Sequence, residues 1–355
     1  MKLESLGWDS FFANHFTPFQ EKGLHPARVA LEHKNAYLTY SAFGELTAEL
    51  TGKMRYQALH REDLPAVGDW VAIQHLEDES RAVIHGVLPR KSKFIRKAAG
   101  EIIEIQILAS NIETAFLVSG LDHDFNPRRL ERFLTLTWDS GASPVILLNK
   151  TDICDDLEAK MAKIEEIAIN APIIPLSAEN DEDLSALSEF LQNGETVVLL
   201  GSSGVGKSTI INRLLGKNVQ AVQEVREDDS RGRHTTTHRE LFVLDNGAMI
   251  IDTPGLREIQ LWDSGDGLQE TFEDVEELAA NCRFRDCKHQ NEPGCEVKKA
   301  LLNGELSRER YESYQKLQKE LAYIDRLQDQ REALEEKRRA KIMSKTINRM
   351  YKDRD

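Results

Sequence analysis

Eight residues near the middle of the chain have the types and the spacing of a phosphate-binding loop. They are Gly201-Ser202-Ser203-Gly204-Val205-Gly206-Lys207-Ser208, which follow a short apolar strand pattern and lead into a helical pattern. The glycines let the backbone curl so that several N–H groups face one anion, and the new helix adds its positive end. We therefore expect Lys207 to reach the β- and γ-phosphates of a nucleotide and Ser208 to offer a hydroxyl to Mg²⁺.

A second motif, Asn149-Lys150-Thr151-Asp152, follows another apolar strand pattern. The Asp152 carboxylate can accept hydrogen bonds from the ring N–H and the exocyclic amine of guanine, whereas adenine would leave that carboxylate unpaired. We expect Asn149 to brace the neighbouring loop, Lys150 to lie over the base, and Ser177-Ala178 to offer a backbone N–H to the guanine oxygen. Alone, the motif is also typical of a helix-starting turn; together with the phosphate loop, it favours GTP over ATP.

The residues expected to sense the γ-phosphate lie beyond the phosphate loop. A polar stretch contains Gly232-Arg233-His234-Thr235-Thr236-Thr237, and the hairpin pattern after it ends in Asp252-Thr253-Pro254-Gly255. We expect Asp252 to hold Mg²⁺ through water and the Gly255 N–H to meet the γ-phosphate. We expect Thr236 to close on Mg²⁺ when that phosphate is present.

The group that activates the attacking water is less plainly marked. Many GTPases place a glutamine directly after the glycine of the second switch, but this chain has Leu256 there. His234 is the candidate for the role, and an exposed histidine in a loop is the alternative. His234 and Lys207 form the predicted catalytic set. The predicted GTP-contacting residues are Asn149, Lys150, Thr151, Asp152, Ser177, Ala178, Gly201, Ser202, Ser203, Gly204, Val205, Gly206, Lys207, Ser208, Thr209 and Gly255.

Three of the four cysteines fall in one short segment with a histidine between them: Cys282, Cys287, His289 and Cys295. Three thiolates and one imidazole are the ligand set of a closed, four-coordinate structural zinc site, with no position left for water. Such crowding favours a metal over disulfides in a cytosolic protein. Free buried thiols are the alternative interpretation.

These motifs need elements to position them. Five short strand patterns between residues 27 and 87 predict a small β-barrel, of the oligonucleotide-binding (OB), SH3-like or small-sandwich kind. Strands then alternate with helices, which predicts a parallel sheet covered on both faces, with Asn149, Ser177 and Gly201 on one rim. A late helix with an apolar face is expected to pack against the Cys/His segment. The predicted limits are 1–26 for an unassigned extension, 27–104 for the barrel, 105–264 for the nucleotide domain and 265–355 for the Cys/His module with its basic tail.

The composition is that of an ordinary folded protein with room for two or three domains. The 355 residues are 40% hydrophobic and 30% charged, with no run of apolar residues long enough to span a membrane. The start lacks a signal-peptide core, so we expect a cytoplasmic protein. The formal net charge of −14 argues against indiscriminate nucleic-acid binding. Two acid-free basic segments, Arg81–Lys97 and Lys337–Lys352, allow a local RNA contact, with a solvated charged face as the alternative.

The motifs stand in an inverted order, because the guanine motif precedes the phosphate loop. A circular permutation can keep one site, since the loops stay on the same rim, and it ties whatever follows Gly255 to the γ-phosphate switch. With a β domain in front and a Cys-rich module behind, this order resembles the ribosome small-subunit-dependent GTPase A family (RsgA, also called YjeQ). The resemblance runs from about residue 27 to about residue 340.

The resemblance implies an OB-like barrel and a GTPase that the small ribosomal subunit stimulates late in its own maturation. The implied partners are GTP or GDP, the small subunit and its rRNA, with no membrane, and we expect a monomer. The implied cofactors are one structural Zn²⁺ and a Mg²⁺ that accompanies GTP. An RNA-binding checkpoint or scaffold that uses GTP mainly as a conformational ligand is the alternative. A permuted GTPase for an unrelated RNA or protein is a third interpretation.

Overall fold

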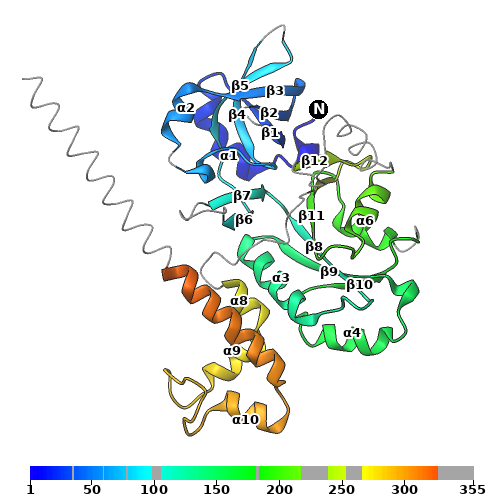
Figure 1. The fold of residues 1–355 in the computed structure, drawn as a ribbon. Coiled ribbons are helices and arrows are strands. Elements are labelled where there is room, and N and C mark those ends of the chain that lie inside the picture. Colours follow the sequence, from blue (N-terminus) through cyan, green and yellow to red (C-terminus); the bar gives the residue numbers. More distant parts are fainter. Residues whose placement is uncertain are drawn as a thin grey trace, which may run out of the picture.

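The computed structural model of the chain describes residues 1–33, 36–58, 60–76, 79–97, 105–180, 184–216, 239–252 and 266–326. Within these ranges the chain builds a β-barrel, an α/β domain and a helical module (Figure 1). This arrangement confirms the predicted fold class. No helix in the described ranges combines the length and the apolar character needed to cross a membrane.

Five strands form the barrel, and their order identifies it. They are β1 (His25–Glu32), β2 (Tyr37–Ser41), β3 (Gly44–Leu50), β4 (Trp70–Leu76) and β5 (Arg81–Val87). The order is β1-β2-β3-β5-β4, with β3 parallel to β5 and with β4 pairing back to β1. Side chains alternate across each strand, so Val29, Ile73 and Ile84 fill the interior. A closed five-stranded barrel of this order is OB-like, which decides against the SH3-like and sandwich alternatives.

The N-terminal extension, left unassigned by the sequence, packs on the barrel. Helix α1 (Ser10–Gln20) begins where the Asp9 carboxylate accepts hydrogen bonds from the N–H groups of Phe11 and Phe12. Trp8 lies edge-on to the fully buried Trp70 of β4, with ring centroids 4.7 Å apart. The short helix η1 (Glu4–Leu6) precedes α1. Two further short helices, α2 (Gly52–Gln57) and η2 (Arg61–Asp63), lie between β3 and β4 in the chain.

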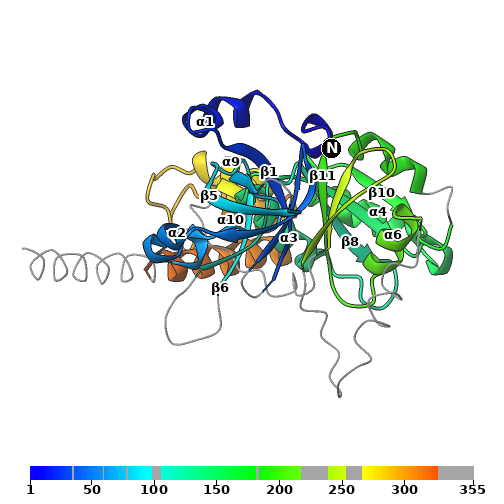
Figure 2. The ribbon, with the colours of Figure 1, turned by 90° about the horizontal axis from the view of Figure 1, so that it is seen from above.

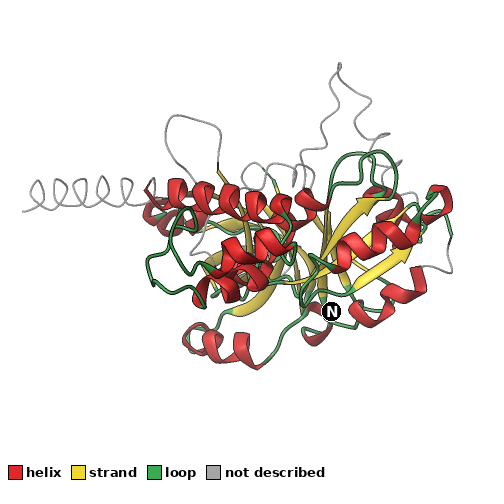
Figure 3. Cartoon of the chain, turned by 90° about the horizontal axis from the view of Figure 1, so that it is seen from below, coloured by secondary structure: helices red, strands yellow, loops and turns green. Residues whose placement is uncertain are grey.

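The α/β domain is a parallel sheet covered on both faces, as predicted. Its strands lie in the order β10 (Ile173–Leu176), β9 (Ser143–Asn149), β8 (Thr114–Gly120), β11 (Thr196–Leu200), β13 (Met249–Asp252), with antiparallel β12 (Glu240–Val243) beyond. Adjacent residues Phe116 and Leu117 belong to cores on opposite faces, which explains the continuous apolar runs. Helices flank the strands (Figure 3): α3 (Pro127–Ser140) and α4 (Leu157–Glu165) belong to one core, and η4 (Ser185–Phe190) and α6 (Lys207–Leu214) to the other.

The barrel and the α/β domain share one sheet, a feature that the sequence did not reveal. Leu31 of β1 pairs with Glu240 of β12, so that eleven strands are continuous (Figure 2). A hairpin of β6 (Lys93–Lys97) and β7 (Ile105–Ser110) stands between the two parts. Within the basic segment, Arg90 forms a two-pronged ion pair with Asp69, at 2.6 and 2.7 Å. The Arg90 guanidinium is therefore held by an ion pair within the folded chain.

The side chain of Arg28 on β1 fastens the barrel to the α/β domain. It is 1% exposed, and its guanidinium donates to the carbonyl oxygens of Leu6, Gly68 and Asn111 and to the Thr196 hydroxyl. Thr196 begins β11, the strand that leads into the phosphate loop. Burial lowers the pKa of Arg28 to about 10, so the group stays charged at neutral pH.

The helical module follows from residue 266. It comprises α8 (Asp266–Thr271), α9 (Glu273–Ala280), α10 (Glu296–Asn303) and a C-terminal helix over residues 308–326. Helix α10 stops at Gly304, whose φ of +79° suits glycine. The apolar stripe of the last helix is buried, with Tyr311 and Leu317 in the same core as Cys295. Leu327 continues the apolar spacing of this stripe in the sequence and lies outside the described residues.

We predict that Arg28→Leu lowers the free energy of unfolding by about 3 kcal/mol, because several buried carbonyl groups lose their hydrogen-bond donor. Urea unfolding followed by tryptophan fluorescence measures this. The control is Arg81→Gln, which removes an exposed pair with Glu49 on the same barrel and should cost about 0.5 kcal/mol. Equal unfolding midpoints for the two variants would contradict the role assigned to Arg28.

Candidate nucleotide site and Cys/His cluster

The phosphate loop joins β11 to α6, and its glycines adopt the conformations that such a loop requires. Gly201, Gly204 and Gly206 have φ values of +154°, +78° and +100°. The Lys207 ammonium curls back over the loop and donates to the carbonyl oxygens of Gly201, at 2.8 Å, and Ser202. Ser208 and Thr209 occupy the first turn of α6, next to the loop.

The side chain of Asn149 connects the phosphate loop with the two segments predicted to read guanine. Its Nδ2 donates to the Val205 carbonyl at 2.7 Å, and its Oδ1 accepts from the Ala178 N–H at 2.8 Å. Asn149 is 2% exposed, so water competes little for these bonds. A Cβ on Gly206 would lie 2.1 Å from Nδ2, so the approach requires glycine. The three motifs thus meet at one place.

The guanine motif has a polar environment of its own. The Ser177 hydroxyl donates to Asp152 Oδ1 at 2.7 Å, which links the two predicted base contacts. Lys150 has a φ of +70°, and its ammonium lies 2.6 Å from Asp122 Oδ2. The hydrogen bond from Lys150 lowers the pKa of Asp122. Thr151 opens the short helix η3 (Thr151–Ile153).

A second polar contact with the phosphate loop comes from a residue outside the sequence motifs. Arg129 on α3 donates to the Ser202 hydroxyl and to Asp124 Oδ2, the latter at 2.7 Å. The hydrogen bond from Arg129 also lowers the pKa of Asp124. The sequence did hold a signal for this contact. Asp124, the partner of Arg129, and Asp122 both follow β8, on the rim where ligands of parallel sheets bind.

The remaining predicted residues divide between the described and the undescribed parts. Asp252 ends β13, which lies parallel to and beside β11, so it stands on the same rim as Gly201. His234, Thr236 and Gly255 lie outside the described residues.

The four predicted metal ligands form a compact cluster. Their ligand atoms all lie within 4.8 Å of one another. Cys282 Sγ is 3.9 Å from Cys295 Sγ, and His289 Nδ1 is 3.6 Å and 3.5 Å from these two sulfurs. A tetrahedral zinc with ordinary bond lengths requires separations of about 3.8 Å between sulfurs and about 3.6 Å from sulfur to nitrogen. The four donors therefore fit a tetrahedral metal in their chemistry, and Cys282, His289 and Cys295 also fit it in their spacing.

The surrounding chain supports this cluster. The Lys298 N–H at the start of α10 points at Cys295 Sγ, 3.4 Å away, as it would toward a thiolate. His289 has a φ of +57°, and its ring packs edge-on against Tyr311, with centroids 6.5 Å apart. Cys154 is not part of this cluster.

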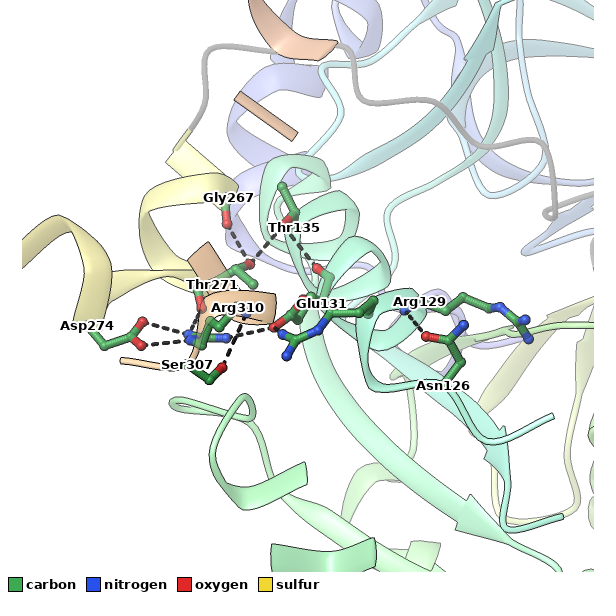
Figure 4. A network of polar contacts seen from close by, with 10 residues as sticks. Asn126, Arg129, Glu131, Thr135, Gly267, Thr271, Asp274, Ser307 and Arg310 are labelled. Carbon is green, nitrogen blue, oxygen red and sulfur yellow. Dashed lines mark hydrogen bonds and ion pairs between the residues drawn. The ribbon is translucent and has the colours of Figure 1, made fainter. Parts of the chain in front are cut away.

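Buried charged side chains join α3, a helix of the α/β domain, to the helical module that carries the cluster (Figure 4). Arg310 of the C-terminal helix donates to Asp274 at 2.6 and 2.7 Å and to the fully buried Glu131 of α3 at 3.1 Å. Burial raises the pKa of Glu131, and the nearby guanidinium groups oppose that shift. Thr135 and Thr271 add a hydroxyl pair at 3.1 Å. The same helix therefore contacts both the phosphate loop and the Cys/His module.

A phosphate loop, a guanine motif earlier in the chain and a parallel sheet that brings them together define a circularly permuted P-loop GTPase. A family model described as RsgA GTPase matches residues 87–262, and one described as 50S ribosome-binding GTPase matches residues 196–337. The small ribosomal subunit biogenesis GTPase RsgA of Opitutus terrae is 51% identical over 93% of this chain and 92% of that protein. RsgA 1 of Oceanobacillus iheyensis is 48% identical over 90% of this chain and 91% of that protein.

A solved structure agrees with these relatives. The crystal structure of YjeQ from Thermotoga maritima is similar with a TM-score of 0.63 and 29% identity, covering 84% of this chain and 99% of that one. The chain belongs to the RsgA GTPase family and is a GTP-hydrolysing enzyme.

Proposed function

We propose that this chain acts in maturation of the small ribosomal subunit, binding its rRNA and hydrolysing GTP to GDP and phosphate with subunit-stimulated turnover. The observation that supports the proposal is the pair of hydrogen bonds made by Asn149, because they join the guanine motif and the Ser177-Ala178 segment to the phosphate loop. The names of relatives at 51% and 48% identity support the ribosomal role.

In this proposal each part of the rim has a task. Asp152 pairs with the guanine edge, and the Ser177 hydroxyl holds that carboxylate in place. Lys207 leaves its two carbonyl partners for the phosphates, where backbone N–H groups of the loop join it. Ser208, Thr236 and Asp252 supply the oxygen ligands suited to Mg²⁺. The remaining GTP contacts are those predicted above, with Gly255 at the γ-phosphate and His234 orienting the water. The Ala178 N–H, which donates to Asn149, would be shared with the guanine oxygen.

The Cys/His cluster would hold one structural zinc and present a surface to RNA. Phe284 is 41% exposed, and the Arg283 guanidinium lies 5.5 Å from its ring centre. An exposed aromatic ring beside a cation suits a base and its phosphate. We also propose a monomeric, cytoplasmic protein with domain limits at 1–26, 27–104, 105–264 and 265–355.

We predict that purified small subunits raise GTP turnover by at least about tenfold, as stimulating partners of other GTPases do. His234→Ala should keep GTP affinity and lose most of this stimulation. The readout is phosphate release with and without subunits. Normal stimulated kcat in the variant would remove His234 from the mechanism. An absence of stimulation in the unaltered chain would favour the checkpoint alternative, which Leu256 in place of glutamine keeps open.

We predict one zinc per chain in protein purified without chelators, measured by elemental analysis. Removing it should unfold the module of residues 282–295, because small metal sites draw much of their folding free energy from the metal. Cys287→Ser should lose the metal, whereas Cys154→Ser, which changes a cysteine outside the cluster, should retain it. Metal-free protein with an ordered module would contradict the assignment.

A further inference from the structure

A groove on the barrel lies apart from both sites described above. It runs between the end of α1, helix α2 and strand β5, with a volume of about 570 Å³. That volume is within the range of about 300–1,000 Å³ typical of ligand sites. None of its lining residues belongs to the nucleotide site or to the Cys/His cluster.

The floor of the groove is apolar and contains an aromatic ring. Phe19 and Leu24 come from α1 and the turn after it, and Met54 comes from α2. Gly86 of β5 lets the Phe19 ring pack directly on the strand, because a Cβ there would lie 2.7 Å from the ring. The Phe19 ring thus packs against β5 where it also lines the groove.

The rim carries two lysines, Lys22 and Lys53, both exposed. In the described part of the chain neither ammonium pairs with a carboxylate, and Lys22 lies 5.9 Å from the Phe19 ring centre. Neighbouring cations differ: Arg55, Arg61, Arg81, Arg90 and Lys91 all form ion pairs. The carboxylate that lines the groove, Asp63, accepts the His60 N–H at 3.0 Å.

We propose that this groove receives a nucleotide of small-subunit RNA, with the base against the Phe19 floor and the flanking phosphates at Lys22 and Lys53. An aromatic floor with point charges at its rim suits a nucleotide, which combines a π-face with an anion. An acidic peptide would use the lysines but has less need of the ring. The inference rests on the proposed function and adds to it a defined contact on the barrel.

Salt dependence tests the contact. The affinity for purified small subunits is measured at several salt concentrations. In the double variant Lys22→Gln/Lys53→Gln the negative slope of log affinity against log salt should become shallower by about 1.5, because each lost phosphate contact removes about 0.7–0.9. The matched control Lys2→Gln/Lys163→Gln removes two other exposed lysines and should leave the slope unchanged. GTP affinity should stay normal in both variants, which shows that the fold is intact.

Cross-linking identifies the occupant. A diazirine side chain at Gln57, which lines the groove, should cross-link to rRNA in the complex with subunits. Cross-links only to ribosomal protein, or an unchanged salt slope while the unaltered chain still binds, would overturn the inference alone. Failure of the unaltered chain to bind subunits would overturn the proposed function together with it.

Discussion

One buried amide side chain fixes the geometry of the nucleotide site. Asn149 bonds to Val205, 56 residues away, and to Ala178, 29 residues away, so the base-reading and phosphate-binding segments cannot move independently. The contact also explains why Gly206 must lack a side chain. Circular permutation leaves this arrangement intact, because β9 and β11 are parallel and end on the same rim.

Two buried arginines hold the barrel and the helical module against the α/β domain. Arg28 holds the barrel against the strand that feeds the phosphate loop, and Arg310 holds the helical module against α3. Helix α3 in turn reaches the phosphate loop through Arg129 and Ser202. Burying a guanidinium costs free energy unless its N–H donors have hydrogen-bond acceptors. Each of these two arginines therefore favours one placement of its outer part relative to the α/β domain. Both outer parts are therefore attached to the domain that binds the nucleotide.

The sequence predicted what depends on local signals. The phosphate loop, the guanine motif and the Cys/His segment are short patterns, and strands such as β8 and β11 are continuous apolar runs. The role of Arg28 escaped prediction, because its hydroxyl partner, Thr196, lies 168 residues away and its neighbours read as an ordinary strand. Helix α1 escaped because its aromatic residues have no clear period, although Asp9 is a recognisable cap. His234 and Thr236 remain predictions, since they lie outside the described residues.

The most direct test of the shared nucleotide site exchanges its base specificity. In Asp152→Asn the new amide has one acceptor for the ring N–H and one donor for the carbonyl that xanthine carries in place of the guanine amine. Calorimetry should show GTP affinity falling by about 100-fold or more and xanthosine triphosphate becoming the better ligand, with Mg²⁺ present throughout. Unchanged preference for GTP in this variant would contradict the claim that Asp152 and the phosphate loop hold one guanine nucleotide between them.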